Sequence, residues 1–210
     1  MGEPIEFLVS RSADTFQVRS RGLRDQLGGE LLAAVTEEWA IDDAIILVKL
    51  AVREAGARPA SSDVWWSPGG FRKIRWTREE DVFRAEERDG RMFRPTIQRA
   101  AAEWGAQAWV CERHGSGCDR IMEESLVALA PRTLRPGVPV EGTRHRMTGD
   151  NSGWILIDDE FTGGAEDLRT DHAAHVATVR PDLVRYFGLP VGWRFFRNAE
   201  GEHVERVSDL

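Results

Sequence analysis

The chain has 210 residues, of which 41% are hydrophobic, and this length suits one large domain or two small ones with apolar cores. Its formal net charge of −7 argues against a nucleic-acid groove, because phosphate binding needs clustered Lys and Arg; a basic protein partner fits this charge better. The two cysteines are too few for a disulfide framework, and no segment holds the roughly 18 consecutive apolar residues of a membrane span. Since no secretion signal is recognisable either, we expect a cytoplasmic protein that does not bind membranes.

The first part of the chain predicts strands around one helical segment. Short β-branched or aromatic runs on either side of a turn predict paired strands at residues 5–9 and 16–20. Good helix formers with apolar residues at helical spacing predict helix over residues 30–55, either as one helix or as two that meet near Asp42. Runs that flank a Ser-Pro-Gly-Gly turn and an Asp-Gly turn then predict an antiparallel meander at residues 63–66, 71–76, 81–87 and 91–94.

The rest of the chain predicts a second group of short elements. Residues 96–104 predict a helix that Gly105 ends, and residues 108–112 predict a strand. Proline at the start and Gly188 after the end predict a short helix at 181–187. Further strands are expected at 126–130, 140–147, 154–158, 192–197 and 203–207, with an extended segment at 175–179. The whole pattern predicts an α+β fold, mostly antiparallel, in two packed units at residues 1–125 and 126–210.

Four motifs of the second predicted unit follow a fixed order. A turn enters an aromatic strand, an acidic loop follows, a short helix begins at a proline, and a hairpin closes the unit. The residues are Asn151-Ser152-Gly153-Trp154, Asp158-Asp159-Glu160, Pro181-Asp182 and Pro190-Val191-Gly192. Over residues 126–209 this order resembles the immunity protein thirty-three family, small α+β domains that bacteria encode beside toxin genes.

The resemblance implies a bacterial immunity protein that binds a cognate toxin and neutralises it sterically, with no enzymatic activity of its own. Asn151 stands where the family has aspartate, and it keeps a side-chain acceptor for the backbone two residues later. The acidic loop differs from the family pattern around Gly163 and Gly164, which bears on the identity of the toxin more than on the fold. Residues 1–125 have no counterpart in the family.

An acidic segment at residues 158–171 is the candidate partner-binding surface. It carries six carboxylates against the single base Arg169, a net charge of −5. Such a segment can steer and cover a cationic toxin surface, although a charged run can equally be a solvated loop without a partner. The candidate contact residues are Asp158, Asp159, Glu160, Glu166 and Asp167.

One loop suggests a metal site. Cys111, His114 and Cys118 offer sulfur and imidazole ligands that suit zinc, but their spacing lacks a paired Cys-x-x-Cys and a fourth ligand. We therefore expect free thiols and a surface histidine. His172 and His175 likewise lack a third ligand nearby.

The sequence offers no catalytic constellation. Ser152 does not lie in the Gly-x-Ser-x-Gly pattern of a nucleophile elbow, and the adjacent Asp158 and Asp159 diverge on a strand end. No phosphate-binding glycine loop is recognisable. We thus predict no catalytic residue, cofactor or metal. Two alternatives stay open: a metal-dependent enzyme that uses Cys111, His114 and Cys118, and a general protein-interaction module.

The tryptophans are expected to determine the fold. Trp154 and Trp193 each follow a glycine and enter a strand, and core packing is favoured over partner binding because each ring has a large apolar area to bury. Trp65 and Trp66 are neighbours on one predicted strand, so their side chains point to opposite faces. One of these two rings is therefore expected to be exposed.

Overall fold

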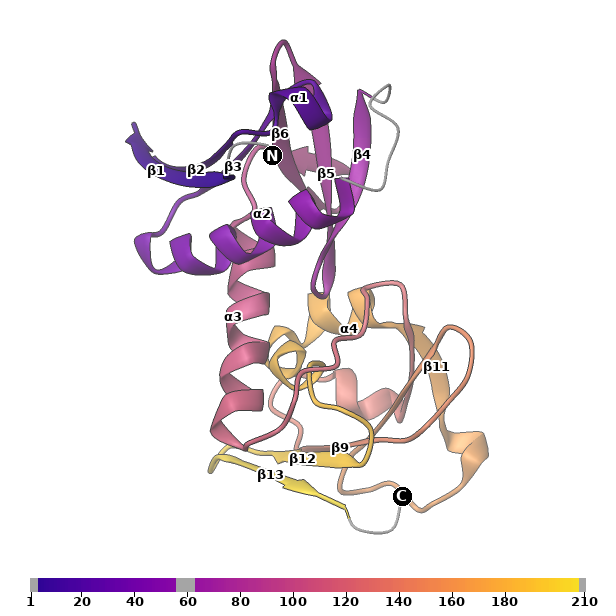
Figure 1. Cartoon of the computed structure of the whole chain (residues 1–210). Coiled ribbons are helices and arrows are strands. Elements are labelled where there is room, and N and C mark those ends of the chain that lie inside the picture. The colour runs from indigo at the N-terminus through magenta and orange to yellow at the C-terminus, as the bar shows by residue number, and fades with distance from the viewer. Residues whose placement is uncertain (1–3, 56–62, 208–210) are drawn as a thin grey trace. The chain divides into compact units, whose positions relative to one another are not determined.

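The computed structural model describes residues 4–55 and 63–207, and the chain divides into two compact units, Met1–Gly105 and Ala106–Leu210 (Figure 1). Each unit has a mixed sheet of its own with helices packed against it, which confirms the predicted α+β class. The division falls 20 residues before the predicted boundary at Ser125. The reason is that residues 106–125 make their contacts in the second unit; Gln107 Nε2, for example, donates to the Val184 carbonyl at 3.1 Å.

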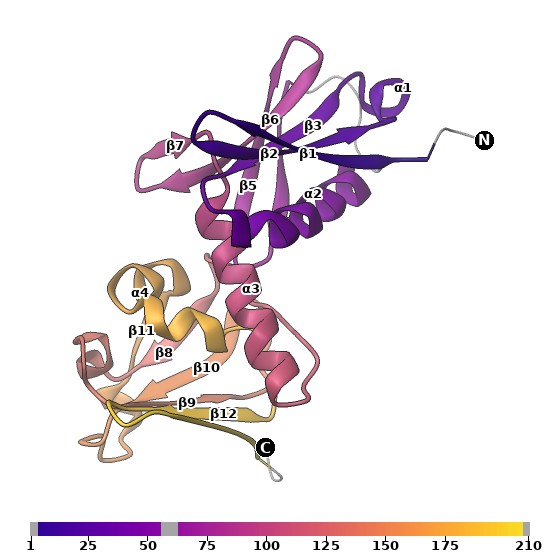
Figure 2. The same ribbon diagram turned by 90° about the vertical axis from the view of Figure 1, so that its left-hand side faces the viewer.

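The first unit is built on a seven-stranded sheet in the order β1-β2-β3-β6-β5-β4, with β7 paired to β6. Among the described strands of this sheet, β3 and β6 are the one parallel pair; the predicted hairpin and meander are confirmed as antiparallel pairs. Helix α2 packs on β2, β3 and β4 and covers one face of the sheet (Figure 2). The elements are β1 (Glu6–Ser12), β2 (Thr15–Arg21), α1 (Arg24–Leu27), β3 (Glu30–Val35), η1 (Glu38–Ala40), α2 (Ile41–Ala55), β4 (Val64–Gly69), β5 (Arg72–Glu79), β6 (Val82–Asp89) and β7 (Met92–Arg94). Helix α3 (Gln98–Arg113) begins in this unit, and its residues from Ala106 on belong to the second unit.

The prediction of helix over residues 30–55 is wrong for its first part. Residues 30–35 form β3, which lies between β2 and β6, and Leu31, Ala33 and Val35 are fully buried there. Partner strands on both sides outweigh the helix propensity of this apolar run. A single helix, α2, follows from Ile41, and Asp42 lies in its first turn.

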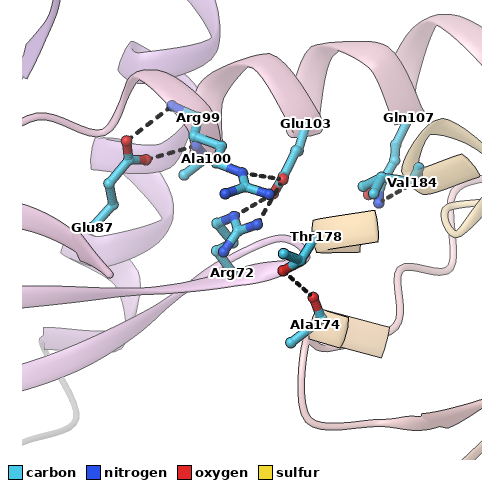
Figure 3. A network of polar contacts seen from close by, with 9 residues as sticks. All are labelled: Arg72, Glu87, Arg99, Ala100, Glu103, Gln107, Ala174, Thr178 and Val184. Carbon is cyan, nitrogen blue, oxygen red and sulfur yellow. Dashed lines mark hydrogen bonds and ion pairs between the residues drawn. The ribbon is translucent and has the colours of Figure 1, made fainter. Parts of the chain in front are cut away.

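Helix α3 is longer than the sequence predicts. Gly105 does not end it, and residues 108–112 continue the helix instead of forming a strand. A Cβ at Gly105 would meet the Asp43 carboxylate, so close packing rather than helix termination accounts for this glycine. The helix start is capped by Glu87, whose carboxylate accepts the N–H groups of Arg99 and Ala100 (Figure 3).

The second unit contains a six-stranded sheet in the order β11-β8-β10-β9-β12-β13. Strand β10 pairs parallel with β8 and antiparallel with β9, and the predicted terminal hairpin is confirmed as β12 and β13. Helix α4 lies on one face of this sheet (Figure 2). The elements are β8 (Leu126–Leu129), η2 (Pro131–Leu134), β9 (Val140–Arg144), β10 (Asn151–Ile157), η3 (Ala165–Asp167), β11 (Arg169–His172), α4 (Ala173–Val179), η4 (Pro181–Tyr186), β12 (Trp193–Arg197) and β13 (Glu202–Arg206).

Residues 175–179 are helical, so the prediction of an extended segment there is wrong. Their alternation of polar and apolar residues resembles a strand, but Ala173, Val176 and Ala177 are buried together at the spacing of one helix face. The predicted short helix after them is confirmed as η4, a 3₁₀ helix that begins at Pro181.

Aromatic rings fill the core of the second unit. Trp154 is fully buried, and its ring centroid lies 5.9 Å from that of Phe187 and 5.5 Å from that of Phe195. This confirms its predicted place in the core, whereas Trp193 is half-buried. In the first unit, Trp65 is buried and Trp66 is exposed, as the alternation along β4 predicts.

Among the helices of the described residues, none combines the length and the apolar character needed to cross a membrane.

Candidate partner-binding surface

The turn at residues 151–154 is held by its own side chains. Asn151 Oδ1 accepts the Gly153 N–H at 2.9 Å, which is the backbone bond that the sequence predicts for this position. The Ser152 hydroxyl donates to the Leu126 carbonyl at 2.6 Å and accepts the Trp154 N–H at 3.2 Å. Gly153 has φ +80°, and a Cβ there would collide with the His145 carbonyl oxygen. The motif therefore fixes how β10 begins.

Arg144 joins this turn to the Pro-Val-Gly motif. Its guanidinium is buried and donates to three backbone carbonyls, those of Ser152, Asp119 and Leu189, while its own carbonyl accepts the Gly192 N–H at 2.9 Å. Burial lowers the pKa of Arg144, and the Asp119 carboxylate, 3.2 Å away, opposes that shift. Both motifs thus serve the fold. Sequence reasoning missed Arg144 because nothing in the residues around it marks a guanidinium that is buried.

Asp158 is the one candidate contact residue that does not face solvent. Its side chain is only 4% exposed, and Oδ1 accepts the Glu160 N–H at 2.9 Å. The same oxygen lies 3.5 Å from Arg132 Nη1. Asp158 therefore shapes the turn after β10, whereas the carboxylates of Asp159 and Glu160 are exposed to solvent.

Asp159 and Glu160 are exposed but not free of counter-charge. Their side chains are 58% and 69% exposed, and each carboxylate lies 2.9 Å from Arg132 Nη1. Arg132 belongs to η2, more than 25 residues earlier in the chain, so the charge count of the segment alone does not include it. The local excess of negative charge is smaller by one than the sequence indicates.

Glu166 and Asp167 carry the least compensated charge of the segment. Both are exposed on η3, and neither forms an ion pair with a residue that the structure describes. The Thr162 hydroxyl donates to Asp167 Oδ2 at 3.2 Å, which steadies the loop without removing charge. The connection from β10 to β11 is therefore an exposed acidic surface.

Asp171 organises the two histidines next to this surface. Its Oδ2 lies 2.5 Å from His175 Nδ1, and its Oδ1 accepts the His172 N–H at 2.8 Å. The His172 ring instead turns to the Glu124 carbonyl, 2.9 Å from Nδ1. The two imidazoles therefore have separate partners.

The thiols of Cys111 and Cys118 contact backbone carbonyl groups. Cys111 Sγ is buried and donates to the Gly188 carbonyl at 3.4 Å, while Cys118 Sγ contacts the Gln107 carbonyl at 3.8 Å. Burial, with a contribution from Cys118, raises the pKa of the Cys111 thiol to about 12, which disfavours a metal-binding thiolate. Burial and the nearby Arg113 lower the pKa of His114. Within residues 4–55 and 63–207, no three His, Cys, Asp or Glu side chains are grouped so that they could hold a metal ion.

The second unit matches a known domain family over most of its length. Residues 106–207 match the Imm33-like domain. The match confirms the resemblance of the C-terminal part to the immunity protein thirty-three family, and it begins at the first residue of the second unit. No curated protein and no solved structure matches the chain significantly.

The Imm33-like domain includes the second half of α3, which the sequence-based boundary assigned to the preceding unit. Its turn motif, the Arg144 contacts and the acidic connection all lie inside the matched residues. Residues 1–105 lie outside the match.

Proposed function

We propose that the protein is a bacterial immunity protein that binds a cognate protein toxin and neutralises it sterically in the cytoplasm. The observation that carries this proposal is the match of residues 106–207 to the Imm33-like domain. The function would reside in that domain, and no turnover of a substrate is involved.

The acidic connection between β10 and β11 is the proposed contact surface. Asp159 and Glu160 project their carboxylates into solvent from a turn that Asp158 holds in place, and Glu166 and Asp167 do so from η3. A surface of this sign accelerates association with a cationic toxin, and buried anchors then determine how long the complex lasts. Burying the toxin's active site or an essential interface would block its action.

The state of Ser152 supports a binding role over hydrolysis. Its hydroxyl is already engaged with the Leu126 carbonyl and the Trp154 N–H. A serine nucleophile instead needs a hydroxyl that donates to a general base. This serine holds the turn together.

The test is co-expression of the full chain with the product of the neighbouring gene, scored by cell survival and by co-purification. The expected result is survival together with a stable complex. The matched control is the chain with D159K, E160K, E166K and D167K, which should protect less well while remaining folded. Survival without any complex, or a toxin that the purified chain chemically alters, would contradict steric neutralisation.

A further inference from the structure

The chain reverses its direction directly after α3. The Ser116 N–H donates to the Cys111 carbonyl at 2.9 Å, and the Gly115 N–H donates to the Glu112 carbonyl at 3.1 Å. Gly115 itself has φ +66°. The two bonds and the left-handed glycine form a Schellman motif, which is a common helix ending. The segment that follows therefore turns back towards the last turns of the helix.

This reversal brings Cys118 next to Cys111. Cys118 Sγ contacts the carbonyl of Gln107, which lies one helical turn before Cys111 in α3, at 3.8 Å. The Gly188 carbonyl accepts the Cys111 thiol at 3.4 Å and also the N–H of Asp119, the residue after Cys118, at 2.8 Å. The two thiols are themselves hydrogen-bonding neighbours. All of these residues belong to the Imm33-like domain.

The two sulfurs differ in their access to solvent. Cys111 is buried, whereas Cys118 is exposed. Burial raises the pKa of the Cys111 thiol, with a contribution from Cys118, so this sulfur is a weak nucleophile at neutral pH. No third metal-binding side chain joins the pair among the residues that the structure describes. An exposed thiol that can be oxidised first, beside a second thiol that can resolve it, is the arrangement of a reversible disulfide.

We propose that Cys111 and Cys118 form an intramolecular disulfide when the protein reacts with hydrogen peroxide. Cys118 Sγ attacks one peroxide oxygen, the O–O bond breaks, and the thiol proton leaves with the other oxygen as water, which gives a sulfenic acid. Cys111 Sγ then attacks Cys118 Sγ. The S–S bond forms, the S–O bond breaks, and the Cys111 proton leaves with the hydroxyl group as a second water. The two thiols lose two electrons, which reduce the peroxide.

The disulfide would tether the segment that contacts Arg144. Asp119 binds this guanidinium through its carbonyl and through its carboxylate, which lies 3.2 Å from Nη2. Arg144 in turn donates to the Ser152 carbonyl at the start of β10. A disulfide bond is about 2 Å long, and thiols that are already neighbours reach this distance with little movement of the backbone. The cross-link should therefore stabilise the domain, because it restricts the unfolded chain.

The test uses the full chain, reduced, freed of reductant and then treated with hydrogen peroxide. We expect the intact mass to fall by two hydrogen atoms and both cysteines to become unreactive to a thiol reagent added under denaturing conditions. Trypsin cleaves after Arg113, so the peptides on either side of it should remain joined until dithiothreitol is added. The oxidised chain should also melt about 5 °C above the reduced chain.

The matched variants are C118S and C111S. The buried thiol of C118S should react with peroxide at least about tenfold more slowly than the exposed thiol of C111S. C111S should gain oxygen at Cys118, because no second thiol in the chain can close the disulfide. Both variants are read against the wild-type mass and peptide map, which decide the inference by themselves.

Four outcomes would each overturn the inference. They are a wild-type mass that rises by oxygen atoms without a cross-link, disulfide-linked pairs of chains as the main product, equal reactivity of the two variants, and an oxidised chain that is less stable than the reduced one. None of them involves a toxin, so the function proposed for the Imm33-like domain would be untouched.

Discussion

Arg132 Nη1 lies 2.9 Å from the Asp159 carboxylate and at the same distance from Glu160. One guanidinium thus balances two of the carboxylates that follow β10, and it does so at the surface, where an ion pair contributes about 0 to 1 kcal/mol. The pairing therefore orders the two side chains more than it stabilises the fold. Glu166 and Asp167, which have no such counter-charge among the described residues, therefore contribute more to the negative electrostatic potential of this surface.

Reversing the exposed charges should slow toxin association without unfolding the domain. For D159K, E160K, E166K and D167K together we expect an association rate about tenfold lower at low salt, because the field that steers a cationic partner changes sign. Stopped-flow kinetics with the cognate toxin would measure this. The difference should shrink as salt is raised, because salt screens exposed charges. Equal rates at low salt would remove the segment from the mechanism.

Asp158 and Asp159 are neighbours with different expected roles. D158A removes the buried acceptor of the Glu160 N–H, and we expect the free energy of unfolding to fall by about 1 to 3 kcal/mol. D159A removes an exposed carboxylate and should change stability by no more than about 0.5 kcal/mol. Urea denaturation of both variants would separate them, and equal losses would argue against a structural role for Asp158.

Trp154 should be the most costly tryptophan to remove. W154A deletes a fully buried ring that packs on Phe187 and Phe195, so we expect a loss of about 3 to 5 kcal/mol in stability. W109A is the matched control, because Trp109 is 44% exposed and lies in the same domain. A W154A denaturation midpoint close to that of W109A would be inconsistent with this core.

Two glycines allow conformational strain and steric collision to be told apart. Gly149 and Gly153 both have positive φ, +70° and +80°, but a Cβ at Gly149 meets open space, whereas one at Gly153 meets the His145 carbonyl. Both substitutions to alanine are strained, and G153A should destabilise the domain by more than G149A, with a difference of about 1 kcal/mol or greater. Thermal denaturation would show the difference. Equal melting temperatures would mean that the turn can relax.

Glu87 should give the first unit a measurable pH dependence. Burial raises its pKa above 4.5, and the N–H bonds from Ala100 and Arg99 only partly oppose this. A carboxyl whose pKa is raised on folding favours the folded state when it is protonated, so its contribution is complete below the unfolded pKa and is lost as pH rises through the folded value. The stability of wild type relative to E87Q should therefore be greatest below about pH 4 and should fall as the pH rises above that value. A difference that stays constant with pH, measured by urea denaturation, would contradict this.

Sequence reasoning succeeded where local chemistry decides the structure. The hairpins follow from their glycine turns, the opposite faces of Trp65 and Trp66 follow from strand geometry, and the bond from Asn151 follows from its side chain. It failed for three short segments, residues 30–35, 108–112 and 175–179. Their state depends on neighbours that are distant in sequence, such as the two strands that flank β3.

At the candidate site, too, the sequence predicts the features that depend on local residues and misses those that depend on tertiary contacts. The acidic composition of residues 158–167 is visible in the sequence, but the burial of Asp158 and the approach of Arg132 are not, because both arise from tertiary packing.

The contacts of Arg144 have a consequence for engineering the Imm33-like domain. This one guanidinium binds the backbone at Asp119, Ser152 and Leu189, and none of those residues lies between β10 and β11. Designers could therefore exchange the connection after Asp158 for loops of other length and charge while the anchoring arginine stays in place. Under the proposed function, specificity for another toxin would then require a new connection only, with the scaffold around Arg144 unchanged.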